Sequence, residues 1–244
     1  MVEHREIYSR HAERYDVLVS REDYQQHILG ALSRILPLDG LTVVELGAGT
    51  GRLTCLLVPA VGRIHAFDRS QHMLDAAAAK LRKLGRFNWS VAVGDHRQVP
   101  MEAGAADAVI AGWSVCYIIE EHGSAWETEL SKTLDEMRRI LRPGGVIVLL
   151  ETLGTGVEVP EPPAGLVRYY EWLEKKGFQR RWIRTDYRFQ DRTEGETLAR
   201  FFFGEEMAAK LVQDERGVIL PECTGIWWMR PTGVPLMEPI SPAG

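Results

Sequence analysis

Apolar residues along the chain fall into two alternating patterns, short β-rich runs and longer stretches with helical spacing. Apolar side chains that recur every three or four residues predict helices at about 51–60, 71–84 and 124–141. Strands that alternate with helices in this way form mostly parallel sheets with helices on both faces. We therefore expect a doubly wound α/β fold. The β-rich runs that predict its first strands are 42–46, 63–68, 88–93, 106–112 and 145–150.

Two further features flank this alternating region. Before it, helical spacing predicts an amphipathic helix over 21–36, with Ser20 as the N-cap and Pro37 as the stop. After it comes a Gly- and Pro-rich connection, 153–165, and long connections of this kind are typical of lids, binding loops or disordered linkers.

The C-terminal part is expected to add helices and strands in turn. Helical spacing predicts a helix over 165–176, and a strand is expected at 181–189. Thr193 and Glu196 have the spacing of a capping box and predict the start of a further helix. A last strand at 217–228 would close a seven-stranded sheet.

Composition places the chain among globular proteins. Hydrophobic residues make up 45% and charged residues 26% of the chain, close to the averages for soluble domains. A net charge of −5 gives no overall basic field for nucleic acid or an anionic membrane. Cys55, Cys116 and Cys223 are too widely spaced for a disulfide framework or a paired zinc motif. The first residues are acidic and unlike a signal peptide, so we expect a cytoplasmic protein.

The strongest chemical signal is a glycine-rich loop directly after the first strand. Its three glycines, Gly47, Gly49 and Gly51, permit a tight turn, a close approach of a ligand to the backbone, and the start of a helix with free amides. In a doubly wound sheet this is where ligands bind. A dinucleotide fingerprint would need a third glycine where the chain has Arg52, and no phosphate-binding P-loop occurs.

The segment E-L-G-A-G-T-G-R-L-T resembles the first motif of class I S-adenosylmethionine-dependent methyltransferases. Later positions resemble the family's pattern in the same order: Asp68 at the end of the second strand, Asp95 after the third, Trp113 after the fourth, and the turn 141–145 before the fifth. The resemblance covers about residues 40–150. It implies a Rossmann-like seven-stranded sheet, S-adenosylmethionine as the cofactor, and an enzyme that transfers its methyl group.

The resemblance also implies roles for individual residues. Asp68 would accept hydrogen bonds from both ribose hydroxyls, for which a carboxylate is suited. Met73 would contact the adenine ring, Asp95 would accept from its amino group, and Trp113 would border the methyl group. Tyr15, in a helix that would also hold Tyr8, would lie near the methionine end. The full set of expected cofactor-binding residues is Tyr15, Glu45, Gly47, Ala48, Gly49, Gly51, Asp68, Arg69, Met73, Asp95, His96 and Trp113.

These expectations divide the chain into parts. A single methyltransferase domain would span 1–230. Within it, 1–37 would form an N-terminal helical cap, 40–150 the cofactor-binding core, and 151–230 the substrate-side elements and last strands. The tail from 231 to 244 is rich in proline and is expected to form no regular element.

The methyl acceptor is expected to be a small molecule, with O- or N-methylation favoured. The segment at Trp113 lacks the Asn/Asp-Pro-Pro-aromatic pattern of nucleobase amino methyltransferases, and no Pro-Cys pair suggests cytosine methylation. Aromatic residues are enriched after residue 150, and small-molecule pockets are commonly lined by such side chains. We therefore expect Tyr169 and Tyr170, with 153–165, to form one wall of the acceptor pocket beside Trp113.

Two alternatives to an enzyme of this kind stay open. One is a protein that binds S-adenosylmethionine as a regulator or assembly partner without catalysis, and the other is a nicotinamide-dependent oxidoreductase. The sequence assigns no catalytic residue and has no metal-ligand spacing. A general base is needed only for a protonated nucleophile, and the candidates near the expected cleft are His11, Tyr15, His96 and His122.

Overall fold

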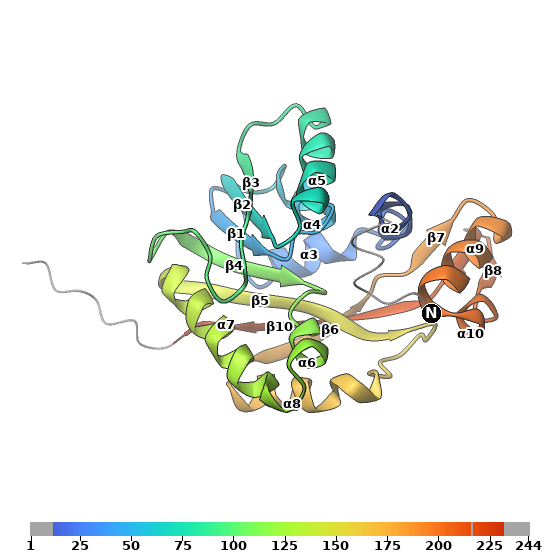
Figure 1. The fold of residues 1–244 in the computed structure, drawn as a ribbon. Helices are drawn as coiled ribbons and strands as arrows, with labels where there is room; N and C mark the ends of the chain where they lie inside the picture. The colour runs from blue at the N-terminus through green and yellow to red at the C-terminus, as the bar shows by residue number, and fades with distance from the viewer. Residues whose placement is uncertain (1–11, 216, 232–244) are drawn as a thin grey trace, which may run out of the picture.

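The computed structural model describes residues 12–215 and 217–231. Its centre is a twisted seven-stranded sheet with helices on both faces (Figure 1). The strand order is β3-β2-β1-β4-β5-β10-β6, in which β10 is antiparallel to both of its neighbours and the pairs from β3 to β5 are parallel. The strands are β1 (Thr42–Leu46), β2 (Arg63–Asp68), β3 (Trp89–Val93), β4 (Ala106–Gly112), β5 (Leu141–Thr155), β6 (Gln179–Arg184) and β10 (Glu222–Met229).

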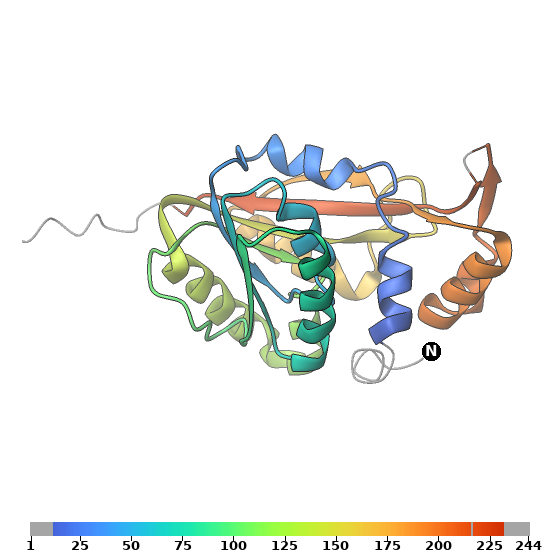
Figure 2. The same cartoon turned by 90° about the horizontal axis from the view of Figure 1, so that it is seen from above.

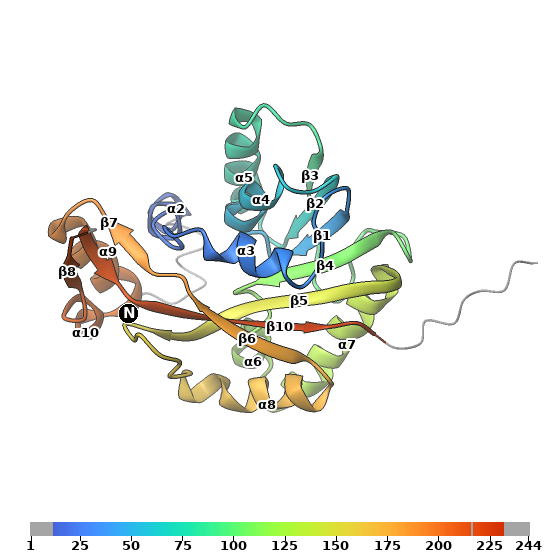
Figure 3. The same ribbon diagram turned by 180° about the vertical axis from the view of Figure 1, so that it is seen from behind.

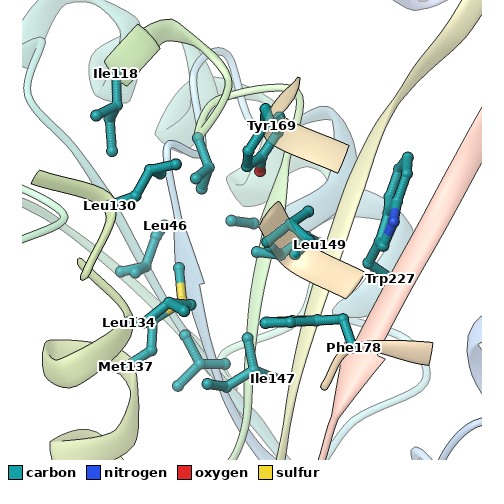
Figure 4. Packing of buried hydrophobic residues seen from close by; sticks show 14 of the residues in the cluster. Leu46, Ile118, Leu130, Leu134, Met137, Ile147, Leu149, Tyr169, Phe178 and Trp227 are labelled. Carbon is teal, nitrogen blue, oxygen red and sulfur yellow. The ribbon is translucent and has the colours of Figure 1, made fainter. Parts of the chain in front are cut away.

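Side chains that alternate along the strands supply two apolar cores, one on each face. Val44 and Leu149 face a core with α6, α7 and α8, whereas Val43 and Val148 face a core with α3, α4 and α5. Figure 4 shows the first of these cores, where Leu134 and Met137 from α7 pack against Ile147. The helices are α3 (His27–Ser33), α4 (Arg52–Leu57), α5 (Gln71–Lys83), α6 (Tyr117–His122), α7 (Trp126–Ile140) and α8 (Val167–Lys175), with 3-10 turns η1 (Gly123–Ala125) and η2 (Ala164–Leu166).

A smaller layer stands at one end of the main sheet (Figure 3). It is a three-stranded antiparallel sheet in the order β7-β9-β8, covered by α9 and α10, and its core contains Leu198, Phe202 and Leu220. Helix α2 stands between α5 and α9 in both Figure 1 and Figure 2. These elements are α2 (Ala12–Val19), β7 (Tyr187–Phe189), α9 (Arg192–Phe203), α10 (Glu205–Ala208), β8 (Val212–Asp214) and β9 (Gly217–Leu220).

The alternating pattern predicted the main sheet well and its last strands less well. The expected strands 42–46, 63–68 and 106–112 have the same bounds in the structure, and β5 extends well beyond 145–150. The expected strand 181–189 is two strands, β6 and β7, in different sheets, and 217–228 is likewise divided into β9 and β10. The last strand does not close the sheet at its edge, because β10 inserts between β5 and β6.

Two predicted helix starts are wrong. The helix expected over 21–36 begins at His27, because the Asp23 carboxylate accepts hydrogen bonds from the backbone amides of His27 and Ile28. Ser20 instead donates its hydroxyl to the carbonyl of Val17. Helix α9 is capped by Asp191, whose carboxylate accepts from the amide of Glu194, rather than by Thr193. Among the described residues, no helix is long and apolar enough to cross a membrane.

Candidate active site

A cavity of about 900 Å³ opens at the carboxyl ends of β1, β2 and β4. This is the edge of the sheet where doubly wound folds bind their ligands. Ten of the twelve expected cofactor-binding residues line it: Tyr15, Glu45, Gly47, Ala48, Gly49, Asp68, Arg69, Met73, His96 and Trp113. The other lining residues are Thr50, Arg52, Leu53, Ser70, Gly112, Ser114, Tyr117, Glu120 and Glu121.

The glycine-rich loop is shaped by its neighbours as well as by its own backbone. Gly47 has φ +72°, and a Cβ at this position would lie 2.3 Å from the Cβ of Ser114. Its amide and that of Ala48 both donate to the carbonyl of Phe67, at 2.8 and 2.9 Å. These bonds fix the loop against the end of β2. A side chain at Gly47 would therefore displace the segment that follows β4.

Gly51 has a different role from the one expected, because it does not line the cavity. It is the N-cap of α4 with φ +78°, and a Cβ there would lie 2.8 Å from the Cβ of Ala77 in α5. Gly51 therefore lets two helices pack closely beneath the loop. The sequence placed it correctly at the start of a helix but did not show this contact.

Asp68 is oriented by two backbone amides. Its Oδ2 accepts from Gly49 at 2.9 Å, and its Oδ1 accepts from Ser70 at 2.8 Å. A carboxylate has about four lone-pair directions, so each oxygen retains capacity for one more donor. The Ser70 side chain in turn caps α5 by accepting from the amide of Met73. The carboxylate thus faces the cavity in a fixed orientation.

Glu45 is a buried acid in the wall of the cavity. Its Oε2 accepts from the Thr54 hydroxyl at 2.7 Å, and only 2% of the residue is exposed. Burial raises the pKa of Glu45 to about 8, and the nearby charge of Asp68 adds to the shift. The side chain therefore carries a proton at neutral pH until a positive charge enters the cavity.

Asp95 lies in the expected turn after β3 but does not line the cavity. Both of its carboxylate oxygens are held by the Arg97 guanidinium, at 2.8 and 2.9 Å, and one also accepts from the Arg97 amide. These hydrogen bonds hold the pKa of Asp95 well below its usual range. The residue lies beside a smaller hollow next to the main cavity and does not line the cavity itself. The expected contact with an adenine amino group is therefore not supported.

Trp113 has a backbone conformation that is rare for a large side chain. Its φ is +49°, and its amide donates to the carbonyl of Leu150 at 2.7 Å. The Arg52 guanidinium carbon lies 3.6 Å from the centroid of the indole ring. Strained residues of this kind are commonly found at ligand sites. The structure thus places Trp113 in the cavity wall, as expected, and adds Arg52 as its support.

Helix α2 closes one side of the cavity through Tyr15. The Asp16 carboxylate accepts from the hydroxyl of Thr50 in the glycine-rich loop at 2.7 Å and also pairs with Lys80 of α5. The Tyr15 ring packs edge-on against Phe202 of α9, with centroids 6.2 Å apart. Helix α2 is therefore attached both to the loop and to the smaller layer. Tyr8 and His11 lie outside the described residues.

Tyr169 and Tyr170 do not line the cavity. They are 0% and 3% exposed, and Figure 4 shows Tyr169 inside the apolar core under α8. The Tyr169 hydroxyl donates to Glu151 at 3.2 Å, and the Tyr170 ring stacks on Trp227 at 4.5 Å. The expectation that they form an acceptor wall is wrong, because α8 packs flat on the sheet. Residues 153–165 do not line the cavity either.

The structure brings in residues that the sequence did not single out. Tyr117 and Glu120 lie three residues apart in α6, so both reach the cavity from one face of that helix. Glu121 accepts two hydrogen bonds from Arg69, at 2.9 and 2.6 Å. The helical spacing after Trp113 could have suggested the first pair. Arg52 stands in the motif itself, where the sequence pattern indicates only that the third glycine of a dinucleotide fingerprint is missing.

The candidate general bases have different positions. Tyr15 and His96 line the cavity, and burial lowers the pKa of His96, so its ring is neutral at pH 7. His122 lies beside the smaller hollow, where its Nε2 is 3.3 Å from an Arg97 nitrogen. Among the residues that the structure describes, these positions do not single out one side chain as a general base. In the part of the chain that the structure describes, no cluster of His, Cys, Asp and Glu could hold a metal ion.

A family model and a curated relative both match part of this chain. Residues 44–149 match the family model described as a methyltransferase domain. A demethylmenaquinone methyltransferase of Lactococcus lactis is 30% identical over 153 residues, which are 60% of this chain and 57% of that protein. The match thus spans little more than half of the relative's length.

Solved structures show the same fold at low sequence identity. An S-adenosylmethionine-dependent methyltransferase of Aquifex aeolicus superposes with a TM-score of 0.53 at 18% identity, over 83% of this chain and 89% of that one. The cyclase SpnF superposes with a TM-score of 0.56 at 19% identity, over 87% and 85%. These similarities concern the fold alone. Because SpnF is named as a cyclase, the fold is not confined to proteins named methyltransferases.

Proposed function

We propose that this chain is a class I S-adenosylmethionine-dependent methyltransferase, which binds S-adenosylmethionine and transfers its methyl group to a small-molecule acceptor. We also propose that residues 1–230 act together as one methyltransferase domain.

One observation carries the proposal: the glycine-rich loop, the fixed Asp68 carboxylate and the strained Trp113 line a single cavity. The cofactor's ribose would bind Asp68, its adenine would lie near Met73 and His96, and its methionine end near Glu45 and Tyr15. The cavity volume of about 900 Å³ lies within the range of roughly 300–1,000 Å³ typical of small-molecule sites.

The bound cofactor would supply an already activated methyl group on a sulfonium. The protein would then hold the two reactants in line and exclude water, and these effects can supply much of a rate enhancement. Trp113 and Tyr117 would form the wall on the side of the acceptor. Leu53 would add apolar surface there. No residue is proposed as a general base.

Oxygen and nitrogen nucleophiles remain the acceptors favoured by the sequence. The Lactococcus relative carries the name of a demethylmenaquinone methyltransferase, which makes a quinol ring a second candidate acceptor. The aromatic wall of Trp113 and Tyr117 is compatible with a flat ring of either kind. We propose no nucleic acid or membrane as the acceptor.

The test combines binding with turnover. Calorimetric titration should give saturable binding of S-adenosylhomocysteine and no binding of NAD. Incubation with S-adenosylmethionine and a panel containing a phenol, an aromatic amine and dihydroxynaphthalene should yield S-adenosylhomocysteine with one of them. Binding of NAD without binding of S-adenosylhomocysteine would refute the proposal.

A protein that binds the cofactor without transfer is the second candidate. The superposition on the cyclase SpnF is compatible with it only in that the fold is not confined to proteins named methyltransferases. It predicts tight binding of S-adenosylhomocysteine and no methylated product with any member of the panel.

A further inference from the structure

Both arginines in the cavity wall are already paired with carboxylates. Arg69 makes two hydrogen bonds to Glu121, and Arg52 forms an ion pair with Glu22. A free arginine at such a place would bind phosphate or carboxylate groups readily, because its planar fork matches their oxygens. An arginine that is already paired with a carboxylate binds a further anion less readily, so the ion pairs determine whether this cavity binds anions.

Glu22 is buried behind Arg52, outside the cavity lining. Its side chain is 3% exposed, compared with 21% for that of Arg52. The segment that carries it is hydrogen-bonded to β7 and to the residue after β6, since Arg188 donates to the carbonyl of Arg21 and Asp23 donates to that of Thr185. Glu22 is therefore held in place by the smaller layer of the molecule.

The pair leaves Arg52 with an unused donor. Arg52 Nη2 is buried and has no hydrogen-bond partner among the described residues, whereas Glu22 also interacts with the hydroxyls of Tyr187 and Thr185. The face of the guanidinium is used by the indole of Trp113. If the charge of Glu22 were removed, Arg52 would lose its ion-pair partner and keep an unsatisfied donor beside the cavity, so its affinity for an anion would rise.

The charges that remain in the cavity wall are negative. The two arginine pairs cancel, since Arg52 opposes the rise that burial causes in the pKa of Glu22. Glu45 and His96 are neutral at pH 7, and the carboxylates of Asp68 and Glu120 are left. This field favours a positively charged cofactor and disfavours a negatively charged acceptor.

We propose that Glu22 determines the charge class of the acceptor: by cancelling Arg52 it excludes anionic molecules, so the acceptor is uncharged or cationic and lies against Trp113. The inference rests on the proposed function, because it takes the space beside Trp113 as the acceptor side. Specificity can arise from interactions that disfavour the wrong ligand as well as from those that favour the right one.

Fluorine NMR of protein labelled with fluorotryptophan tests the proposal, with inorganic phosphate as the probe and S-adenosylhomocysteine bound. The chain has seven tryptophans, and Trp113→Phe identifies the resonance of Trp113. Phosphate should not shift this resonance saturably in the wild type. In Glu22→Gln it should do so, and in the double variant with Arg52→Gln the response should disappear. Sodium chloride at matched ionic strength separates binding from screening.

Asp186→Asn is the matched control, since it removes another buried carboxylate that pairs with an arginine, Arg184, outside the cavity lining. It should leave the Trp113 resonance insensitive to phosphate. Glu22→Asp keeps the charge but retracts it by one methylene, so it should give a saturable response of its own, weaker than that of Glu22→Gln. Its response above the wild-type level can be measured even where Glu22→Gln does not fold.

The outcomes separate this inference from the proposed function. A saturable response to phosphate in the wild type, or none in either Glu22 variant when S-adenosylhomocysteine binds, would overturn the role of Glu22. Failure of the wild type to bind S-adenosylhomocysteine would instead refute the proposed function.

Discussion

Asp68 is held by the amides of Gly49 and Ser70, so its carboxylate is fixed before a ligand binds. Replacement of Asp68 by alanine should weaken S-adenosylhomocysteine by about 1.5–3 kcal/mol, the range for hydrogen bonds to a charged group. The fold should survive. Asp95→Asn is the control at the neighbouring strand end and should leave the affinity within a factor of about two, because Asp95 does not line the cavity. Calorimetry that finds equal losses in both variants would contradict this assignment.

Glu45 gives cofactor binding a pH dependence with a defined sign. Its pKa of about 8 means that the carboxyl is protonated at pH 7, and a cationic ligand favours the ionised form. Affinity for S-adenosylmethionine should therefore rise as the pH rises toward about 8, by at most about tenfold per pH unit, and then level off. Glu45→Gln should bind with little pH dependence. A wild-type affinity that falls over this range would contradict the assignment.

The same raised pKa affects the stability of the ligand-free protein. Because the folded-state pKa lies above the unfolded value of about 4.5, the contribution of Glu45 is present below that value and is lost as the pH rises through about 8. Glu151, with a pKa raised to about 7 by burial, acts in the same direction. Denaturant unfolding should show lower stability at pH 8.5 than at pH 5.5 from these two groups, and Glu45→Gln should reduce the slope.

At the scale of elements, helix α2 is the part whose attachment bears most directly on the cavity. Asp16 joins it to the glycine-rich loop through Thr50 and to α5 through Lys80. Asp16→Asn should speed dissociation of S-adenosylhomocysteine about three- to tenfold, as expected for loss of roughly 1 kcal/mol of charge-assisted hydrogen bonding. Asp75→Asn, which changes an exposed acid of α5 that accepts from Gln71, should not change the rate. Stopped-flow fluorescence measures both, and equal rates in all three proteins would show that α2 does not retain the cofactor.

The elements also show what a sequence can and cannot predict. The first, second and fourth strands were predicted to the residue, because hydrophobic runs and flanking turn residues are local signals. The start of α3 depends on Asp23, whose backbone has the unusual φ of +55°, and no local pattern indicates that. The assignment of β6 and β7 to different sheets depends on pairing with β10 and β9, which are distant in the chain.

For the site, too, the sequence predicted what local patterns determine and missed what depends on contacts in the folded chain. Most of the ten expected residues share the cavity because they lie at or just after strand ends that the sheet brings together, while Tyr15 comes from α2 and Met73 from α5. Asp95 failed as a cavity residue because its partner, Arg97, lies two residues away and folds back on it. Tyr169 and Tyr170 failed because helical spacing identifies a buried face without showing which cavity, if any, lies beside it.

At the scale of the whole molecule, the core under α8 and the cavity are separate parts. Tyr170→Ala should destabilise the protein by about 3–5 kcal/mol, the range for truncating a large buried aromatic ring, because it removes the stack on Trp227. Cofactor affinity of the folded variant should not change. Tyr170→Phe should cost less, since only the hydrogen bond to Thr152 is lost. Denaturant titration measures the stability, and a folded Tyr170→Ala with impaired cofactor binding would show that the two parts are coupled.

The crystal structure of the complex with S-adenosylhomocysteine tests the central claim most directly. The account predicts that the ribose hydroxyls lie on the Asp68 carboxylate, that the adenine contacts Met73, and that the sulfur faces the wall formed by Trp113 and Tyr117. A ligand bound elsewhere, or bound in the cavity with its ribose away from Asp68, would contradict it.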